Sequence, residues 1–231
     1  MMANLNIATL NINGMNERRK QELLEDYLRT EKITCCLIQE HNLKCQSAIY
    51  DIISDKYDIF FNASIKLKGG TMILLDKSIK YSVIGLEMSH DSRIISLKIN
   101  IESQYLHLLN VYAPSGKQYQ NEREDLFKNE ILYYLRNSLS NTVWGGDFNC
   151  IIRKTDVSNK NSTLKSIALE NTIKHLKLTD AWFVKHISLH IHIFERIMAL
   201  GWIDFMWEIC GNLYLMLPLK MYVSLIMHQL F

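Results

Sequence analysis

The sequence has little of what separates domains or marks repeats. It contains only two prolines and nine glycines in 231 residues, and no linker, internal repeat or low-complexity run is visible. These scarcities argue against several domains joined by flexible segments. Because 48% of the residues are hydrophobic and 22% are charged, the chain can bury a sizeable core. We therefore expect residues 1–231 to form a single domain.

Cysteine and long apolar runs are also scarce. The five cysteines lack metal-ligand spacing, and Cys35 and Cys36 lie inside an apolar segment. This usage is typical of core thiols in a reducing, intracellular compartment. The uncharged run Ile209–Leu219 is shorter than the ~20 apolar residues of a membrane span. The first residues do not resemble a signal peptide, so we expect no membrane association.

An excess of one charge is absent too, since the formal net charge at pH 7 is only +2. A globally basic surface is thereby excluded, and binding to nucleic acid would depend on local basic clusters. Such clusters occur at Arg18–Lys20, at Lys66 with Lys68, and at Arg153 with Lys154. We take Arg153 and Lys154 as candidate substrate-binding residues. Solvated helix and loop faces explain each cluster equally well.

The sequence does contain four apolar segments that deliver polar side chains suited to catalysis. Ile7–Gly14 carries Asn11, Cys35–Glu40 ends in Glu40, Leu106–Pro114 carries Tyr112, and Trp144–Asn149 carries Asp147 and Asn149. Side chains two positions apart in a strand face the same way, so Asp147 and Asn149 can address one reacting group. A glycine–aspartate pair after a strand is more often only a turn. Four such segments together, however, indicate a site at one edge of a sheet.

Apolar periodicity predicts alternating strands and helices. Strands are expected at Asn6–Asn11, Cys35–Gln39, Tyr57–Asn62, Gly70–Asp76, Ile94–Ile101, Tyr105–Tyr112, Thr142–Gly145 and Ile203–Trp207. Helices are expected at Glu17–Thr30, Glu122–Ser138 and Leu164–Leu176. Short turns such as Lys68–Gly70 favour antiparallel pairing, and the helices would cover outer faces. The pattern predicts an α+β fold, with two mostly antiparallel sheets packed face to face and flanked by helices.

The polar segments resemble a known family. Thr9–Gly14, Ile38–Glu40, Asn110–Pro114 and Gly146–Asn149 are similar, in order and spacing, to motifs of the endonuclease/exonuclease/phosphatase superfamily. From about Asn6 to His228 the chain most resembles the endonuclease domain of non-LTR (LINE-type) retrotransposons. The resemblance implies a four-layer α/β sandwich and Mg²⁺-dependent nicking of DNA, with Mn²⁺ as a substitute. The nick would serve a reverse transcriptase that this chain does not contain.

Cleavage of a phosphodiester needs a cation, a base for water and donors for the phosphate oxygens. Glu40 is the candidate metal ligand, because magnesium takes oxygen ligands and needs only one or two protein carboxylates. The resemblance implies the other roles. Asn11 would orient Glu40 or bind a metal-bound water, and Asp147 would be the general base. Asn149 would hold Asp147 or contact phosphate, and Tyr112 would donate its hydroxyl to a phosphate oxygen.

The C-terminal part departs from the family pattern. The resemblance implies that Asp204 orients a catalytic His228, but Gly201 and Trp202 replace a serine–arginine pair, and Met227 replaces an aspartate. A thioether is a poor ligand for a hard cation. Loss of one charge-stabilising group commonly lowers rates by ~10²–10³. The chain could therefore be a truncated or decayed copy.

Three functions follow from these observations as hypotheses. The first is a DNA endonuclease of a non-LTR retrotransposon, acting as a monomer in the nucleus. The second is an inactive remnant that still binds nucleic acid. The third is a phosphatase or another phosphodiesterase of the same superfamily.

Overall fold

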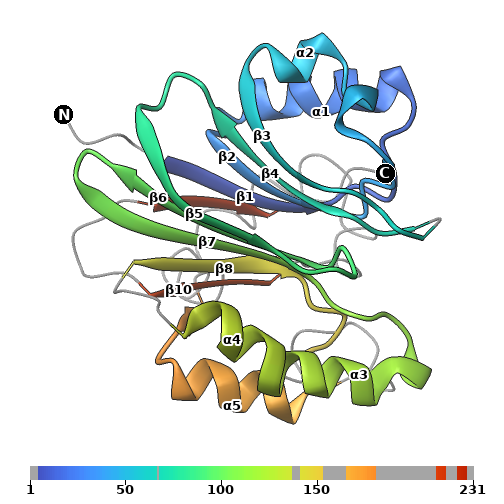
Figure 1. Ribbon diagram of the computed structural model, residues 1–231, viewed down its shortest axis with the longest axis vertical. Coiled ribbons are helices and arrows are strands. Elements are labelled where there is room, and N and C mark those ends of the chain that lie inside the picture. Colours follow the sequence, from blue (N-terminus) through green and yellow to red (C-terminus); the bar gives the residue numbers. More distant parts are fainter. Residues whose placement is uncertain are drawn as a thin grey trace, which may run out of the picture.

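A computed structural model of the protein describes residues 5–66, 68–136, 141–152 and 165–180, and the backbone of 212–216 and 223–227. Two β-sheets lie face to face, and helices cover both outer faces (Figure 1). This is the α+β, four-layer sandwich that the sequence predicts. Within the described residues, no helix combines the length and apolar character needed to cross a bilayer.

The first sheet has five strands in the order β11-β1-β2-β4-β3. Their bounds are β1 Leu5–Asn11, β2 Cys35–Gln39, β3 Tyr57–Asn62, β4 Thr71–Asp76 and β11 Val223–Met227. The sheet is mixed, because β1 runs parallel to β11 and β2, whereas β4 is antiparallel to β2 and β3. Its outer face is covered by α1 (Arg18–Thr30) and α2 (Asp51–Ser54), and a 3₁₀ turn, η1, spans Gln46–Ala48.

The second sheet has six strands in the order β5-β6-β7-β8-β10-β9. Their bounds are β5 Tyr81–Met88, β6 Ile94–Ile101, β7 Gln104–Tyr112, β8 Thr142–Asp147, β9 Thr179–Asp180 and β10 Asn212–Met216. Only β7 and β8 are parallel neighbours, and the remaining pairs are antiparallel. After the 3₁₀ turn η2 (Lys117–Tyr119), the outer face carries α3 (Gln120–Asp125), a π-helical turn η3 (Leu126–Glu130), α4 (Ile131–Leu135) and α5 (Ile167–His175).

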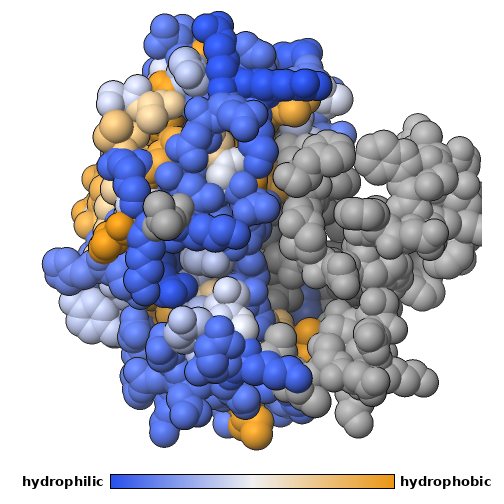
Figure 2. All heavy atoms as spheres, turned by 90° about the vertical axis from the view of Figure 1, so that its right-hand side faces the viewer, coloured by the Kyte–Doolittle hydropathy of each residue, from blue (hydrophilic) through white to orange (hydrophobic). Residues whose placement is uncertain are grey.

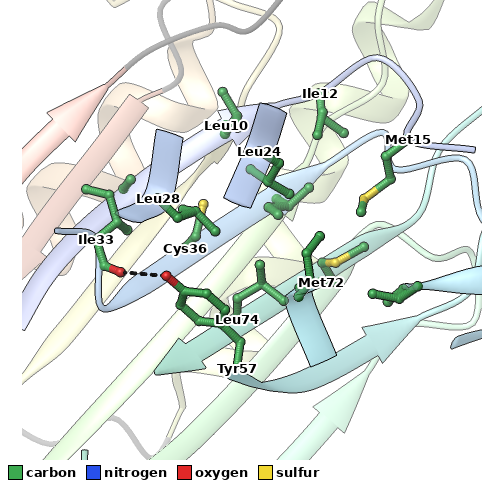
Figure 3. Close-up of a cluster of buried hydrophobic side chains, with 14 of the residues drawn as sticks. Leu10, Ile12, Met15, Leu24, Leu28, Ile33, Cys36, Tyr57, Met72 and Leu74 are labelled. Atoms are coloured by element: carbon green, nitrogen blue, oxygen red, sulfur yellow. Dashed lines mark hydrogen bonds between the residues drawn. The ribbon is translucent and has the colours of Figure 1, made fainter. Parts of the chain in front are cut away.

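Alternation along the strands divides the apolar side chains into separate layers. In β1, Ile7 faces the other sheet, whereas Ala8 and Leu10 face α1. Figure 3 shows this helix-side layer, in which Leu24 and Leu28 of α1 pack over the sheet. Burial of each such leucine contributes roughly 1.5–3 kcal/mol. The layer between the sheets holds them face to face, while the ends of the strands lie outside these layers.

The expected elements agree closely with the observed ones. Cys35–Gln39, Tyr57–Asn62 and Ile94–Ile101 form strands with the predicted bounds, and the other elements that were predicted differ from the observed ones at their ends. The Glu122–Ser138 helix is in fact α3, the π turn and α4, beginning at Gln120. The sequence prediction missed α2 and the strands β5, β9, β10 and β11, and the expected strand at Ile203–Trp207 lies outside the described residues.

Candidate active site

Four strand ends meet at one edge of the sandwich, which we call the site edge. Parallel pairing places Asn11 of β1 opposite Gln39 of β2, immediately before Glu40. In the other sheet, parallel pairing places Tyr112 of β7 opposite Asp147 of β8. The carboxyl ends of parallel strands lie on the same side of a sheet, so both pairs point to one edge.

Asn11 joins the two sheets at the site edge. Its Nδ2 donates to Glu40 Oε1 at 2.9 Å and to Asp147 Oδ2 at 2.8 Å. Its Oδ1 accepts a hydrogen bond from the Asn13 N–H at 3.0 Å. One side-chain amide thus holds together two carboxylates that come from opposite sheets.

Tyr112 lies against the same carboxylates. Burial, followed by the charge of the neighbouring Glu40, raises the pKa of the Tyr112 phenol. The hydroxyl therefore stays protonated at neutral pH and can act as a donor. Arg93 flanks the ring, with its guanidinium carbon 5.4 Å from the ring centre, a distance suited to a cation–π contact.

Asn149 is tied to Asp147 and to the neighbouring loop. Its backbone N–H donates to Asp147 Oδ1 at 3.0 Å, and its Nδ2 donates to Ala113 O at 2.9 Å. Each oxygen of Asp147 consequently accepts one hydrogen bond from the protein. The aspartate is held in one orientation from both sides.

Unusual backbone conformations occur where the site residues leave their strands. Glu40 and Asn149 have φ angles of +53° and +49°, which is the left-handed region that costs a non-glycine residue roughly 1–2 kcal/mol. Gly146 has φ +149°, and a Cβ there would lie 1.9 Å from Val111 O. Glycine is therefore required at this point, directly before Asp147.

The electrostatics of Asp147 suit a proton acceptor. Burial is the main cause that raises the pKa of Asp147, and the nearby charge of Glu40 raises it further, while hydrogen bonds from Asn11 and Asn149 oppose the shift. A raised pKa brings a carboxylate closer to the basicity that general base catalysis requires.

Glu40 and Asp147 also fit a hard divalent cation. Both carboxylates bond to the same Asn11 nitrogen, so their negative charges lie close together, and a cation would relieve their repulsion. No group of three or more His, Cys, Asp or Glu side chains able to hold a metal occurs among the residues that the structure describes. Magnesium does not need one, since it usually keeps several waters.

Several expected site residues lie outside the described part of the chain. These are Arg153, Lys154, Asp204 and His228. Met227 is described only by its backbone, at the end of β11, where it pairs with Thr9 of β1. Because β11 and β1 are parallel, β11 ends at the site edge.

Sequence reasoning missed the buried polar residues behind the site. Asn110 lies within one of the quoted motifs, and its Nδ2 donates to Ile38 O at 2.9 Å and Met72 O at 2.8 Å in the opposite sheet. Its Oδ1 accepts from Gln39 Nε2 at 2.6 Å. The signal in each case was a polar residue inside an apolar run. Gln39 stands one position before Glu40, and Asn110 stands two positions before Tyr112.

His41 is a second missed residue. Its Nδ1 accepts from the Leu43 N–H at 3.0 Å, so its Nε2 carries the proton and donates to Asn62 O at 3.0 Å. Burial lowers the pKa of His41 to about 4. A neutral imidazole thus anchors the loop that follows Glu40.

Comparison with solved structures identifies the architecture. An AP endonuclease from Archaeoglobus fulgidus has a TM-score of 0.66 and 20% identity, covering 92% of this chain and 86% of that one. The human Nocturnin catalytic domain with bound sulfate has a TM-score of 0.62 and 8% identity, covering 94% and 84%. D. rerio TDP2 in complex with a single-strand DNA product has a TM-score of 0.60 and 14% identity, covering 94% and 86%.

No protein-family model matches the sequence. At the identities of these solved structures, the likeness defines the fold. That fold is the one that the sequence motifs led us to expect.

Proposed function

We propose that the protein is a Mg²⁺-dependent DNA endonuclease, able to use Mn²⁺, from a non-LTR retrotransposon. The observation that carries the proposal is the single Asn11 amide that bonds both Glu40 and Asp147 at the site edge. Similarity to an AP endonuclease and to TDP2 with a DNA product supports hydrolysis of phosphodiesters. The motif wording supports the retrotransposon origin.

Each residue of the site has a role in this reaction. Glu40 would hold the cation, which when bound supplies positive charge at the scissile phosphate. Asp147 accepts the proton of the attacking water, and Asn149 keeps it oriented. Tyr112, protonated at neutral pH, donates to a non-bridging phosphate oxygen. Asp204 and His228, which lie outside the described residues, would complete the site, with Asp204 orienting the catalytic His228.

The charge distribution favours a polyanionic substrate. The loops of the site edge, the last residue of β8 and the first turn of α1 carry Arg18, Arg19, Lys20, Lys44, Lys66, Lys68 and Arg93, whereas their carboxylates are Glu17, Glu40, Asp91 and Asp147. In Figure 2, which faces this edge, the coloured residues form a largely hydrophilic surface. The loops at the opposite edge balance Lys32, Lys56, Lys77 and Lys80 with Glu31, Asp55, Asp76 and Glu102. Excess positive charge beside the site would attract a nucleic-acid backbone.

An inactive nucleic-acid-binding remnant is the second candidate. Met227, at the end of β11, and the Gly201–Trp202 pair favour it.

In an active element, the 3′ hydroxyl released by nicking would prime the reverse transcriptase domain. We propose that this occurs in the nucleus, with the endonuclease acting as a monomer.

Nicking of supercoiled plasmid by the purified protein tests the proposal. Magnesium or manganese should support nicking and a chelator should abolish it, and Glu40→Gln or Asp147→Ala should lower the rate by ~10²-fold or more. Asp76→Ala, at the opposite end of β4, is the matched control and should retain activity. Nicking that survives Asp147→Ala would refute the assigned base.

The same protein preparation separates the rival functions. Salt-sensitive DNA binding without nicking would identify the remnant. Hydrolysis of a small phosphate ester without nicking would identify the phosphatase. Charge reversal at Arg153 and Lys154 should weaken DNA binding more than reversal at Lys77 and Lys80, which lie at the opposite edge.

A further inference from the structure

We propose that Lys20 is a positioning residue that fixes the side-chain amide of Asn11 in its working orientation. Lys20 lies in the first turn of α1, in the intermediate range of exposure. The effect of Lys20 on catalysis rests on the proposed endonuclease function. Its contacts with the loop between β1 and α1 do not depend on that function.

The ammonium of Lys20 caps three consecutive backbone carbonyls. Its Nζ donates to Asn13 O at 3.1 Å, Gly14 O at 3.0 Å and, less closely, Ile12 O at 3.5 Å. The carbonyls converge because Asn13 and Gly14 have φ angles of +45° and +88°. Converging carbonyl dipoles repel one another, and an ammonium with three donors and no acceptor satisfies them together.

The turn that Lys20 holds also directs backbone N–H groups toward the site. The Asn13 N–H donates to Asn11 Oδ1 at 3.0 Å, and the Gly14 N–H donates to Glu40 O at 2.6 Å. The Met15 N–H continues the connection to His41 O at 3.0 Å. The loop after β1 is thereby joined to the loop that carries Glu40.

This arrangement decides which way the Asn11 amide points. Because a backbone N–H occupies Oδ1, the two hydrogens of Nδ2 face Glu40 and Asp147. A rotated amide would turn its oxygen toward two carboxylates and leave the Asn13 N–H without its acceptor, which is costly. Lys20 therefore acts on the two carboxylates through the loop and Asn11.

The neighbouring basic residues do not share this geometry. Side chains in a helix lean toward its N-terminus, and this brings Lys20 back over the preceding loop. Arg18 pairs with Glu22 at 2.9 Å, and Arg19 is exposed. Lys44 caps carbonyls of a different loop, bonding Ser64 O at 2.9 Å and Ile65 O at 3.1 Å. These residues supply matched controls.

The experiment compares Lys20→Met with Arg19→Met and Lys44→Met. Arg19→Met removes the same charge from the same turn, and Lys44→Met removes a loop-capping ammonium that does not reach Asn11. Because Arg19 and Lys44 belong to the positive charge proposed to attract the nucleic-acid backbone, all three variants should raise KM for nicking. Only Lys20→Met should also lower kcat, by about 10- to 100-fold, since small displacements of catalytic groups have effects of this size. KM should change no more than in Arg19→Met. Lys20→Arg, which keeps the charge in a planar fork, should lie between Lys20→Met and the parent.

A second readout does not require activity. In metal-free protein, the ¹⁵N–¹H resonances of the Asn11 side-chain amide should move in Lys20→Met and remain unchanged in both controls. Unchanged Asn11 resonances in folded Lys20→Met or Lys20→Arg protein would overturn the proposal, as would equal losses of kcat in all three methionine variants. A parent protein that does not nick DNA would refute the proposed function, while the resonances would still decide the role of Lys20.

Discussion

Gly146→Ala should damage both the stability and the site of this protein. Gly146 lies in β8 opposite Val111 of β7, directly before Asp147. A Cβ at Gly146 would lie 1.9 Å from Val111 O, and also within 3.0 Å of the carbonyl carbon and nitrogen of Val111. These are backbone atoms in a parallel ladder, so no side chain can rotate away. The two strands would have to separate until that distance reaches at least 3.0 Å.

Two costs add in this variant. Forcing alanine into a positive φ costs roughly 1–2 kcal/mol, and overpacking a well-filled interior costs about 1–3 kcal/mol. The free energy of unfolding should therefore fall by about 2–5 kcal/mol, and Tm by about 4–20 °C for a domain of this size. Separation of β7 and β8 would also lengthen the hydrogen bond from Asn11 Nδ2 to Asp147 Oδ2, which is now 2.8 Å. We expect kcat for nicking to fall by ~10²-fold.

Thermal melts followed by circular dichroism, with nicking assays below Tm, measure both effects. Gly85→Ala is the control, because a Cβ there would meet Lys98 Cδ at an ordinary 3.7 Å in the same sheet. It should change stability by no more than about 0.5 kcal/mol. A Gly146→Ala protein with the Tm and kcat of the parent would show that our reasoning about this close approach is wrong.

Three further predictions concern acid and metal. Burial lowers the pKa values of His41 and His107 to about 4 from 6.5. Each neutral histidine therefore contributes to the free energy of unfolding, fully above pH 6.5, and this contribution, up to about 3 kcal/mol, is lost as pH falls toward 4. Urea unfolding at pH 7 and at pH 4.5 measures this loss. In metal-free protein, a ¹³C NMR titration of the Asp147 carboxyl should give a pKa above the ordinary aspartate value of 3.8, because burial raises it; a pKa at or below 3.8 would contradict this account of its environment. Met227→Asp should increase nicking only with magnesium, and not beside Asp147→Ala; rates equal to the parent in folded protein would instead support a decayed remnant.

Local sequence patterns were sufficient for most strands but not for β5. Cys35–Gln39 and Ile94–Ile101 are apolar runs with polar boundaries, and burial in the sandwich rewards that pattern directly. In β5, Val83, Ile84 and Leu86 are exposed at the edge of the sheet, and the register shifts between Val83 and Gly85. A bulge interrupts the alternation by which a strand is identified. Only pairing with β6 makes this segment a strand.

The order of amino acids alone specifies which side chains are available for chemistry. Asn11, Glu40, Tyr112 and Asp147 follow or end apolar runs because a polar group is tolerated where a strand leaves the core. It also specifies the glycine that stands directly before Asp147, because this glycine is part of the motif. Those positions lie up to 136 residues apart, and periodicity within each run says nothing about distances between runs.

That these side chains meet is a consequence of the fold. Parallel pairing of β1 with β2 and of β7 with β8 directs both pairs of strand ends to the same edge. Packing of the two sheets then brings Asn11 within hydrogen-bond distance of both carboxylates. The same packing brings Asn110 and Gln39 together across the two sheets, and this contact has no local signature because the two residues are distant in the chain. The contacts of Lys20 depend instead on the shape of the folded loop between β1 and α1.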